Sequence, residues 1–369
     1  MKRLKIAFLT EFFYPHIGGC EKRLFEIGRR LASKGHEIHV FTIQYDRNLP
    51  QEEKIDGVNV HRYAFSRSYI SEDSFRSLGG ILQYSSASFF KLLGSKFDLY
   101  YANQWPMLHS LCTKPIASPF IQEWCEVWDK PLRASIMQRL IKRVGDFNVA
   151  VSEFTRQRLV DQLKINFDKI SLIPNGVDLE RFYNSQKKIK GRIIYAGRIV
   201  PHKHVELLVK AFQKVKAKIP DAELHIIGSG LSLKSIKQMS KNTKDCYVHG
   251  FLPDEKMVDL FKSSWLFVLP SEREGSGIAA LEAMAAGVPF ITADFPNNAT
   301  KELCRFECGL VIKPEEDAFA SAIIELYKND ELWNKLSANA LSTAKMHDWD
   351  NIATQMEDLF NTVVKNATD

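Results

Sequence analysis

Short apolar runs alternate with longer stretches of helical periodicity along the chain, and this alternation starts twice. The first series begins with a strand predicted over residues 5–10 and a helix over 20–34, where Leu24, Ile27 and Leu31 recur at steps of three and four. Its further strands are predicted at 36–43, 58–63, 98–102, 119–124 and 148–151. The second series is predicted at 192–196, 223–227, 246–249, 266–269 and 288–292. Strands that alternate with helices indicate two doubly wound α/β domains with parallel sheets.

The boundary between the two series is predicted near residue 180. Turn-forming residues gather at 173–178, and a charged stretch at 186–190 has the composition of an exposed linker. An amphipathic helix predicted over 349–364 has no strand after it, so it is expected to return to the first domain. The expected organisation is a first domain over 1–180, a second over 181–345 and a returning C-terminal helix within 346–369.

Composition supports a globular cytoplasmic protein. The chain has 369 residues, of which 45% are hydrophobic and 25% charged, and this length favours two cores over one. No apolar run reaches the roughly 20 residues of a membrane-spanning helix, and no signal-peptide core precedes the first strand. Six cysteines are scattered, and the close pair Cys304 and Cys308 lacks the spacing and His neighbours of a zinc site, which favours buried free thiols.

The net charge of +6 is concentrated in the first half. Residues 1–180 hold 25 Lys and Arg against 20 Asp and Glu, whereas the remainder holds 25 against 24. This excess fits an anionic partner such as a membrane surface, although solubility alone explains it equally well, and no nucleic-acid partner is predicted. A helix predicted over 131–144 carries an apolar stripe (Leu132, Ile136, Leu140, Ile141) and basic residues elsewhere (Arg133, Arg139, Lys142, Arg143). It could lie on anionic lipid, but packing of its stripe on its own sheet is favoured.

Ligands of doubly wound sheets bind beyond the carboxyl ends of the strands, so the turns after strands are the first places to search. After the first strand, Gly18 and Gly19 open a helix, and paired glycines let the backbone approach a phosphate. A purely structural turn explains them as well, because the Gly-x-Gly-x-x-Gly fingerprint is missing.

The turn at 197–203 follows the first strand of the second series. Arg198 and Lys203 in this turn can converge on the two phosphates of a nucleoside diphosphate. The alternative is a solvated basic loop.

The segment 272–287 is the most informative one. Gly275, Ser276 and Gly277 lead into a helix that starts near Ile278, and the free amides of such a helix start favour an anion. Glu282, about one turn further, can accept hydrogen bonds from ribose hydroxyls, and Glu274 can accept them from a bound sugar. A surface carboxylate on an Ala-rich helix remains the alternative, and it fits Glu274 better than Glu282.

In order and spacing, these motifs resemble those of retaining glycosyltransferases of family 4, also called glycosyl transferases group 1. The resemblance runs nearly end to end and adds four segments to those above: 175–178, 228–230, 250–251 and 270–271. It implies the GT-B fold, in which two Rossmann-like domains face each other across a cleft.

The resemblance also implies roles for individual residues. Arg198 and Lys203 would clamp the diphosphate, Glu282 would contact the ribose and Glu274 the donor sugar or its surroundings. Amides of 275–278 would cradle sugar and phosphate, Gly18 and Gly19 would meet the diphosphate from the other domain, and the stretch around Gly250 and Phe251 would line the base. Neither a metal nor another cofactor is implied.

The resemblance further implies transfer of a hexosyl-type sugar, with retention, from a UDP- or GDP-sugar. The acceptor is predicted to be a hydroxyl of a glycan or a lipid-linked glycan, and the charge excess of the first half with its basic helix at 131–144 favours an enzyme that is cytoplasmic or peripheral on the inner face of the membrane. Sugar-nucleotide epimerases of the same fold are an alternative class.

One segment departs from the family pattern. Many relatives have Trp-His-Glu at the end of a first-domain strand, where this chain has Trp124, Cys125 and Glu126. A neutral thiol is a weak hydrogen-bond donor. Either Glu126 or a backbone carbonyl does the polar work there, or the chain is a catalytically weak or silent nucleotide-sugar binder.

Asp348 and Asp350 resemble the metal-binding Asp-x-Asp of other glycosyltransferases. Their place at the start of the last predicted helix favours helix capping instead.

Overall fold

The computed structural model describes residues 2–16, 18–65, 76–128, 132–183 and 187–368, with side chains except those of 132–134 and 368. The chain divides into a first unit, Met1–Asn175 with Trp349–Asp369, and a second unit, Gly176–Asp348. The sequence had placed these boundaries at 180 and 345. Each unit is described by itself.

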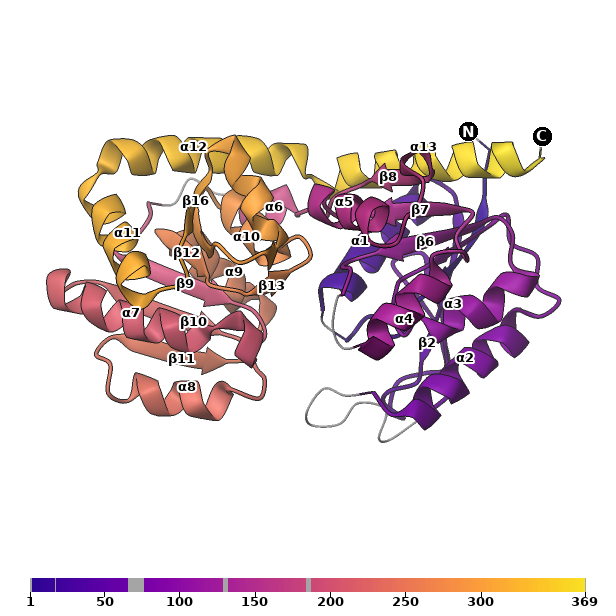
Figure 1. Cartoon of the computed structure of the whole chain (residues 1–369), viewed down its shortest axis with the longest axis horizontal. Coiled ribbons are helices and arrows are strands. Elements are labelled where there is room, and N and C mark those ends of the chain that lie inside the picture. Colours follow the sequence, from indigo (N-terminus) through magenta and orange to yellow (C-terminus); the bar gives the residue numbers. More distant parts are fainter. Residues whose placement is uncertain (1, 17, 66–75, 129–131, 184–186, 369) are drawn as a thin grey trace. The chain divides into compact units, whose positions relative to one another are not determined.

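The first unit is built on one sheet with helices on both faces (Figure 1). Its strands are β1 (Lys5–Leu9), β2 (Glu37–Ile43), β3 (Glu52–Ile55), β4 (Val58–Tyr63), β5 (Leu99–Ala102), β6 (Phe120–Trp124), β7 (Phe147–Ala150) and β8 (Ile170–Leu172). Its helices are α1 (Gly19–Ser33), α2 (Leu78–Leu92), α3 (Leu108–Thr113), α4 (Leu132–Ile141), α5 (Glu153–Asp161) and α13 (Trp349–Thr368), with short 3₁₀ turns η1 (Lys114–Ile116) and η2 (Phe167–Lys169).

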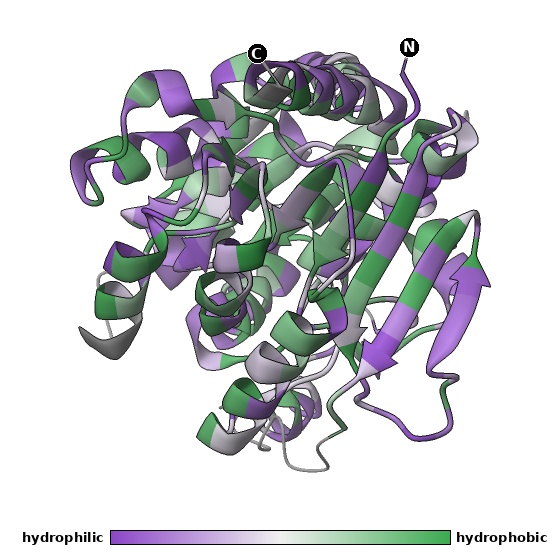
Figure 2. Cartoon of the chain, turned by 90° about the vertical axis from the view of Figure 1, so that its right-hand side faces the viewer, coloured by the Kyte–Doolittle hydropathy of each residue, from purple (hydrophilic) through white to green (hydrophobic). Residues whose placement is uncertain are grey.

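Strand order in this sheet is β3-β4-β2-β1-β5-β6-β7-β8, and every neighbouring pair is parallel except β3 with β4. Buried and partly buried residues alternate along β4, and Figure 2 shows strands of the first unit banded between hydrophobic and hydrophilic residues. Two apolar clusters cover the two faces. Phe360 of α13 lies 5.4 Å from Tyr101 of β5, between ring centroids, so the last helix is part of this unit's core.

The second unit has a sheet of order β11-β10-β9-β12-β14-β16 whose neighbouring strands are all parallel. Its strands are β9 (Arg192–Ala196), β10 (Glu223–Ile227), β11 (Cys246–Gly250), β12 (Leu266–Leu269), β14 (Phe290–Ala293) and β16 (Gly309–Ile312), with a separate pair β13 (Arg273–Glu274) and β15 (Asn297–Asn298). Its helices are α6 (Leu179–Phe182), α7 (Val205–Lys218), α8 (Leu233–Ser240), α9 (Asp254–Ser263), α10 (Ile278–Ala285), α11 (Glu316–Lys328) and α12 (Asp330–Met346), with 3₁₀ turns η3 (Pro201–Lys203) and η4 (Ala299–Phe306). The predicted α/β class and the two parallel sheets are confirmed.

Both sheets have a point at which the strand order reverses. In the first unit it lies between β1 and β5, and in the second between β9 and β12. Loops that leave neighbouring strands in opposite directions open a crevice at such a point, which is where ligands of doubly wound sheets bind. The loops after β1, β5, β9 and β12 are therefore the ones that position the candidate site.

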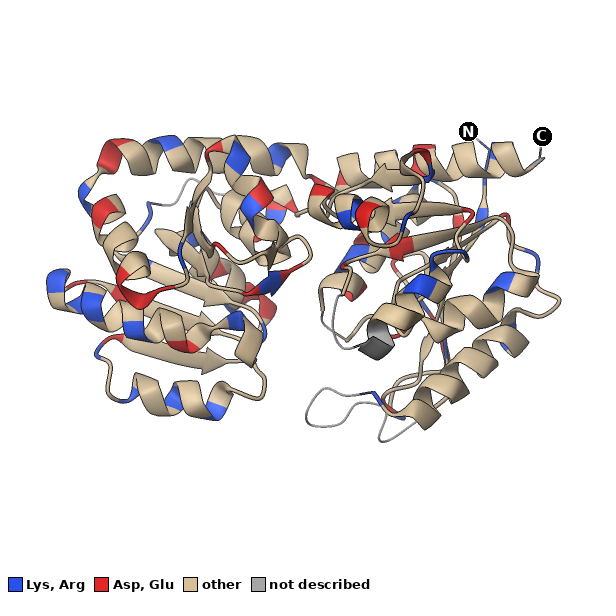
Figure 3. Cartoon of the chain, viewed as in Figure 1, with Lys and Arg blue, Asp and Glu red and all other residues tan. Residues whose placement is uncertain are grey.

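In the described part of the chain, no helix is long and apolar enough to cross a membrane. Lys and Arg are interspersed with Asp and Glu in both units (Figure 3). All six cysteines are free, but only Cys308 is fully buried, so the prediction of buried thiols was wrong for the other five.

Candidate functional site

Two loops at the switch point of the second unit bring the predicted cation and carboxylate together. Lys203, at the end of η3 after β9, is 8% exposed and forms an ion pair with Glu274 of β13. Its Nζ also donates to the backbone oxygen of Arg273 at 3.5 Å. The backbone N–H of Glu272 donates to the backbone oxygen of His202 at 2.9 Å, so the two loops are joined by main chain as well.

Positive charge is concentrated around this pair. Burial, together with Lys203, Arg273, Arg198 and His204, lowers the pKa of the His202 imidazole to about 3. Nearby cations disfavour the protonated imidazole for the same reason that they favour a bound anion. The structure places Arg198 in the same loop with an exposed side chain, and its backbone oxygen accepts a 2.8 Å hydrogen bond from the Tyr195 hydroxyl.

The turn after β10 packs directly against the backbone of the Arg198 loop. Gly228 has φ +136°, and a Cβ there would lie 1.8 Å from the backbone oxygen of Gly197. Gly230 has φ +148°, and a Cβ there would lie 2.4 Å from the backbone oxygen of Ile199. Since only glycine fits these contacts, the Gly-Ser-Gly segment holds the cationic loop in place.

The glycine-rich turn at 275–277 opens α10. Gly277, the residue before the helix, has φ +74°, and a Cβ there would lie 2.5 Å from the hydroxyl oxygen of Thr300. The first amides of a helix lack intrahelical acceptors and carry its positive end, so this turn can take up an anion. Glu282 lies in the second turn of α10 and is 6% exposed.

Two contributions to this site were missed from the sequence. Asn298 pairs in register with Glu274 across the β13–β15 ladder, and its side chain bonds Thr292, the backbone oxygen of Ala293 and the amide of Thr300. The Thr300 hydroxyl is buried and has no hydrogen-bond partner among the described residues. Residues 297–300 reach the site through the β13–β15 ladder. This ladder is only two residues long, so it leaves no pattern in the local sequence.

The predicted base-lining stretch lies at the end of β11, beside the turn that follows β10. Gly250 ends β11, and its backbone oxygen accepts a 2.8 Å hydrogen bond from the Gly228 amide. Phe251 follows with a side chain that is 68% exposed. An exposed aromatic ring held by a rigid turn is suited to stacking on a nucleobase.

The glycine turn in the first unit is less open to an anion than predicted. Gly18 is the residue before α1, Gly19 is the first residue of that helix, and Ile17 lies outside the described residues. A Cβ at Gly18 would lie 2.2 Å from a carboxylate oxygen of Glu21, so a negative charge covers this turn. His16 lies 3.3 Å from the same carboxylate.

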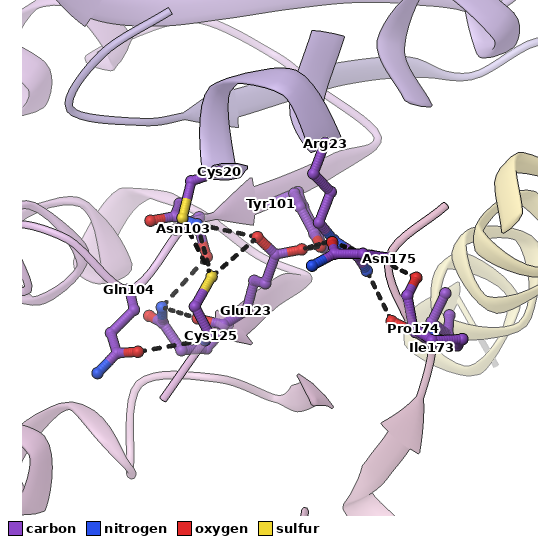
Figure 4. A network of polar contacts seen from close by, with 12 residues as sticks. Cys20, Arg23, Tyr101, Asn103, Gln104, Glu123, Cys125, Ile173, Pro174 and Asn175 are labelled. Atoms are coloured by element: carbon purple, nitrogen blue, oxygen red, sulfur yellow. Dashed lines mark hydrogen bonds and ion pairs between the residues drawn. The ribbon is translucent and has the colours of Figure 1, made fainter. Parts of the chain in front are cut away.

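Cys125, directly after β6, belongs to a buried polar network in the first unit (Figure 4). Its Sγ lies 3.3 Å from Sγ of Cys20 and accepts a 3.5 Å contact from the side-chain amide of Asn103. The Cys20 thiol, burial and the charge of Glu123 raise the pKa of Cys125 well above its usual range. The backbone amides of Cys125 and Glu126 both donate to the side-chain oxygen of Gln104, at 3.2 and 3.3 Å.

Glu123 is the centre of this network, and it was not predicted as a site residue. Its carboxylate accepts from Arg23 at 2.6 Å, from Asn103 at 2.9 Å and from the Tyr101 hydroxyl. Burial alone would lower the pKa of Arg23, but the charge of Glu123 outweighs it and raises that pKa. For Tyr101, burial and the charge of Glu123 act in the same direction, and both raise the pKa of its hydroxyl. The carboxylate of Glu123 lies beside Cys125, with its Oε1 3.9 Å from Sγ, and the predicted role of Glu126 or a backbone carbonyl there stays a prediction.

Arg23 joins the network to the end of the first unit. Its guanidinium donates to the backbone oxygens of Ile173 and Pro174, at 2.9 and 2.6 Å, and to the side-chain oxygen of Asn175 at 3.1 Å. An Arg on the apolar face of a helix and a Glu within an apolar strand are the sequence signals that could have indicated this pair.

Among the described residues, no group of three His, Cys, Asp or Glu is arranged to hold a metal ion. Asp350 forms an ion pair with Arg30 of α1. Asp348 precedes α13 and bridges to Val177 in the second unit.

Two doubly wound sheets, each with a crevice at its switch point, form the GT-B fold seen in solved glycosyltransferases. The Anabaena protein Alr3699/HepE, solved in complex with UDP-glucose, superposes with a TM-score of 0.78 at 17% identity, covering 98% of this chain and all of that one. A family model described as Glycosyl transferases group 1 matches residues 178–343, and one described as Glycosyltransferase Family 4 matches 17–181.

The chain belongs to the group 1 glycosyltransferases. It is 26% identical to an uncharacterised glycosyltransferase, MJ1607, of Methanocaldococcus jannaschii, over 97% of this chain and 98% of that one. It is 23% identical to a phosphatidyl-myo-inositol mannosyltransferase of Mycolicibacterium smegmatis, over 98% and 94%. The predicted family is confirmed. The matches support a glycosyltransferase rather than the sugar-nucleotide epimerase that was the alternative class.

Proposed function

We propose that this glycosyltransferase moves a hexosyl-type sugar, with retention of configuration, from a UDP- or GDP-sugar to a hydroxyl of a glycolipid or glycan. The observation that carries this proposal is Lys203, a buried lysine paired with Glu274 in a loop cluster where burial and then the neighbouring cations lower the pKa of His202. Such a cluster favours a ligand with a concentrated negative charge, and a diphosphate supplies one.

The departing diphosphate is the group that the second unit would stabilise. Lys203 and Arg198 would hold its two phosphates, and the amides at the start of α10 would add the positive end of a helix. Glu282 would bond the ribose and Glu274 the transferred sugar. With these cations in place, stabilisation of the diphosphate would need no metal ion. The sugar would keep its configuration if the acceptor attacks the face from which the diphosphate leaves.

The surroundings of Phe251 leave the choice between UDP and GDP open. Its exposed ring offers stacking, which favours neither base, and the UDP-glucose bound to Alr3699/HepE is the chemical precedent for a uridine donor.

A lipid-linked acceptor is supported by the surface of the first unit. The predicted packing of the α4 stripe on its own sheet holds for Ile141 but is wrong for Ile136 and Leu140, which are 48% and 51% exposed. On α2, Leu78, Leu82 and Phe90 are exposed as well. Exposed apolar side chains beside the exposed Arg139 and Arg143 suit an anionic lipid surface.

The mannosyltransferase relative, whose name states phosphatidyl-myo-inositol as its substrate, supports the same acceptor class. We therefore propose that the enzyme works peripherally on the inner face of the membrane.

A catalytically silent nucleotide-sugar binder is the second candidate. It is favoured by Cys125, whose weakly donating thiol stands where relatives have histidine and whose raised pKa keeps it neutral. Such a protein would bind the donor through the second unit without releasing free nucleotide.

The donor is tested by thermal unfolding of the full chain with UDP, GDP, ADP and their sugars. A ligand at 100 times its dissociation constant adds about 2.7 kcal/mol of stability, so UDP or GDP should raise the unfolding temperature and ADP should not. Chromatographic detection of nucleotide released from the stabilising donor, with a phosphatidylinositol or glycan acceptor, separates the transferase from the silent binder. Stabilisation by none of the nucleotides would reject both candidates.

Co-sedimentation tests the membrane surface. The chain should pellet with anionic but not with neutral vesicles at low salt, and Ile136→Ser with Leu140→Ser should weaken this binding. Exposed Ile189 in the second unit offers a matched control as Ile189→Ser. Efficient transfer to a soluble oligosaccharide, without sedimentation on either vesicle, would assign the enzyme to soluble acceptors.

A further inference from the structure

Two thiols from distant parts of the chain meet at the edge of the polar network in Figure 4. Cys20 lies in the first turn of α1, Cys125 follows β6, and 105 positions separate them, yet their sulfur atoms are 3.3 Å apart. Each residue keeps some exposed surface, but the thiol of Cys125 is itself buried, so Cys20 is the one that a small reagent meets first. A disulfide needs a sulfur separation of about 2.0 Å, so a shift of little more than an ångström would join them.

The elements that carry the two thiols are already held in register. Arg23, one turn after Cys20 on α1, is bonded to Glu123, two residues before Cys125, through a fully buried ion pair. The thiols are thus presented to each other by a rigid framework and do not depend on a chance approach of two loops. Such a framework lowers the entropy lost when the bond forms.

We propose that Cys20 and Cys125 form a reversible disulfide that switches the enzyme off under oxidising conditions. The oxidant is a low-molecular-weight disulfide of the glutathione class. Disulfides in proteins of reducing compartments are mostly transient and redox-sensing, which is the behaviour expected here.

The reaction is ordinary thiol–disulfide exchange. The thiolate of Cys20 attacks one sulfur of the oxidant, forms a mixed disulfide and releases one thiolate. Cys125 then loses its proton to solvent, attacks Sγ of Cys20 and releases the second thiolate. Two protein thiols lose two electrons in total, and one small disulfide is reduced to two thiols. Cys20 reacts first because the raised pKa of Cys125 disfavours its thiolate.

The effect on transfer rests on the proposed function. Oxidation removes the S–H of Cys125, a predicted site residue, and it ties the helix start after Gly18 to the end of β6. The disulfide would also link the start of α1 and the end of β6 close to Arg23. Arg23 in turn bonds residues 173–175, where the chain leaves the first unit. A fixed turn without the thiol donor should lose transfer activity.

The bond itself is tested without any substrate. The reduced full chain is equilibrated in glutathione buffers of increasing disulfide content, alkylated and analysed by peptide mass spectrometry. We expect a cross-linked peptide that contains Cys20 and Cys125, has lost two hydrogen atoms and disappears with dithiothreitol. Cys20→Ser should lack it, whereas Cys112→Ser, a control in the same unit, should keep it. Two intact thiols in pure glutathione disulfide, or oxidation of Cys125 to another cysteine, would overturn the proposal.

The switch is tested by the ratio of oxidised to reduced activity within each protein. This ratio should fall at least tenfold for wild type and Cys112→Ser and stay near one for Cys20→Ser. A disulfide that forms and leaves the ratio unchanged would overturn the regulatory role. Absence of transfer by the fully reduced wild type would instead count against the proposed function, since the mass-spectrometric result does not depend on it.

Discussion

Removal of either predicted clamp residue should weaken binding of the nucleoside diphosphate. Arg198→Ala removes an exposed guanidinium, and Lys203→Ala removes an ammonium that is almost fully buried. A hydrogen bond to a charged group contributes about 1.5–3 kcal/mol, which corresponds to an affinity loss of about 10-fold to 150-fold.

The structure predicts that the two losses differ. Solvent screens the exposed Arg198, so Arg198→Ala should fall at the lower end of this range. Lys203→Ala also leaves the carboxylate of Glu274 unpaired beside the bound phosphates, so its loss should be larger. The double variant Lys203→Ala with Glu274→Ala should recover part of the affinity, because the repelling carboxylate is then gone as well.

Isothermal titration calorimetry with the bare nucleoside diphosphate measures this order directly. Lys210→Ala is the matched control, because Lys210 is an exposed lysine of α7 in the same unit that pairs with Glu316. Wild-type affinity in both clamp variants would refute the assignment, as would equal losses in a clamp variant and in the control.

Four further outcomes are expected. Glu282→Ala should weaken nucleotide binding more than turnover, and Glu274→Ala the reverse, as seen by calorimetry and initial rates. Excess EDTA should leave activity intact, because cations and a helix start supply the positive charge; a loss that magnesium reverses would contradict this. Burial lowers the pKa of His109 to about 3, so His109 stays neutral in the folded protein while the unfolded chain takes up a proton, and stability is lost as pH falls from about 6.5 to about 3, at up to about 1.4 kcal/mol per pH unit. Urea unfolding of His109→Gln should therefore show a flatter acid limb. Gly228→Ala should lower both the unfolding temperature and donor affinity, because its Cβ would meet the backbone oxygen of Gly197.

The long parallel strands could be predicted from the sequence because each is an apolar run between helical periods. The strands at 58–63, 192–196, 223–227 and 266–269 have the predicted bounds. Besides the short pair β13 and β15, three strands of the two main sheets were missed for physical reasons. All three lie at a sheet edge, where one side of the strand has no partner strand among the described residues. β3 (EEKI) is charged and partly exposed, β8 has only three residues, and β16 begins with a glycine and keeps Val311 exposed.

The candidate site also has a part that could be predicted from the sequence and a part that could not. Arg198, Lys203 and Glu274 follow strands that neighbour each other at a switch point, so topology alone brings their loops together. Arg23 and Glu123 are 100 positions apart, and the local sequence around either residue does not indicate which residue it pairs with. Thr300 reaches Gly277 only because the β13–β15 ladder turns its loop inward, and a two-residue ladder leaves no sequence pattern.

The saturation of Glu123 bears on how catalysis is divided within the enzyme. Its carboxylate already accepts from Arg23, Tyr101 and Asn103, so it has little capacity to act as a base for Cys125, whose Sγ is 3.9 Å away. A neutral, weakly donating thiol beside a saturated carboxylate can orient an acceptor but contributes little charge stabilisation. Stabilisation of the departing diphosphate would then come mainly from the cations and helix start of the second unit, whereas the thiol and the turn beside it would act on the acceptor, which is the step that the proposed oxidation would block. Substitutions at Cys125 should then alter acceptor affinity more than donor affinity, which is the opposite of the order expected for Lys203.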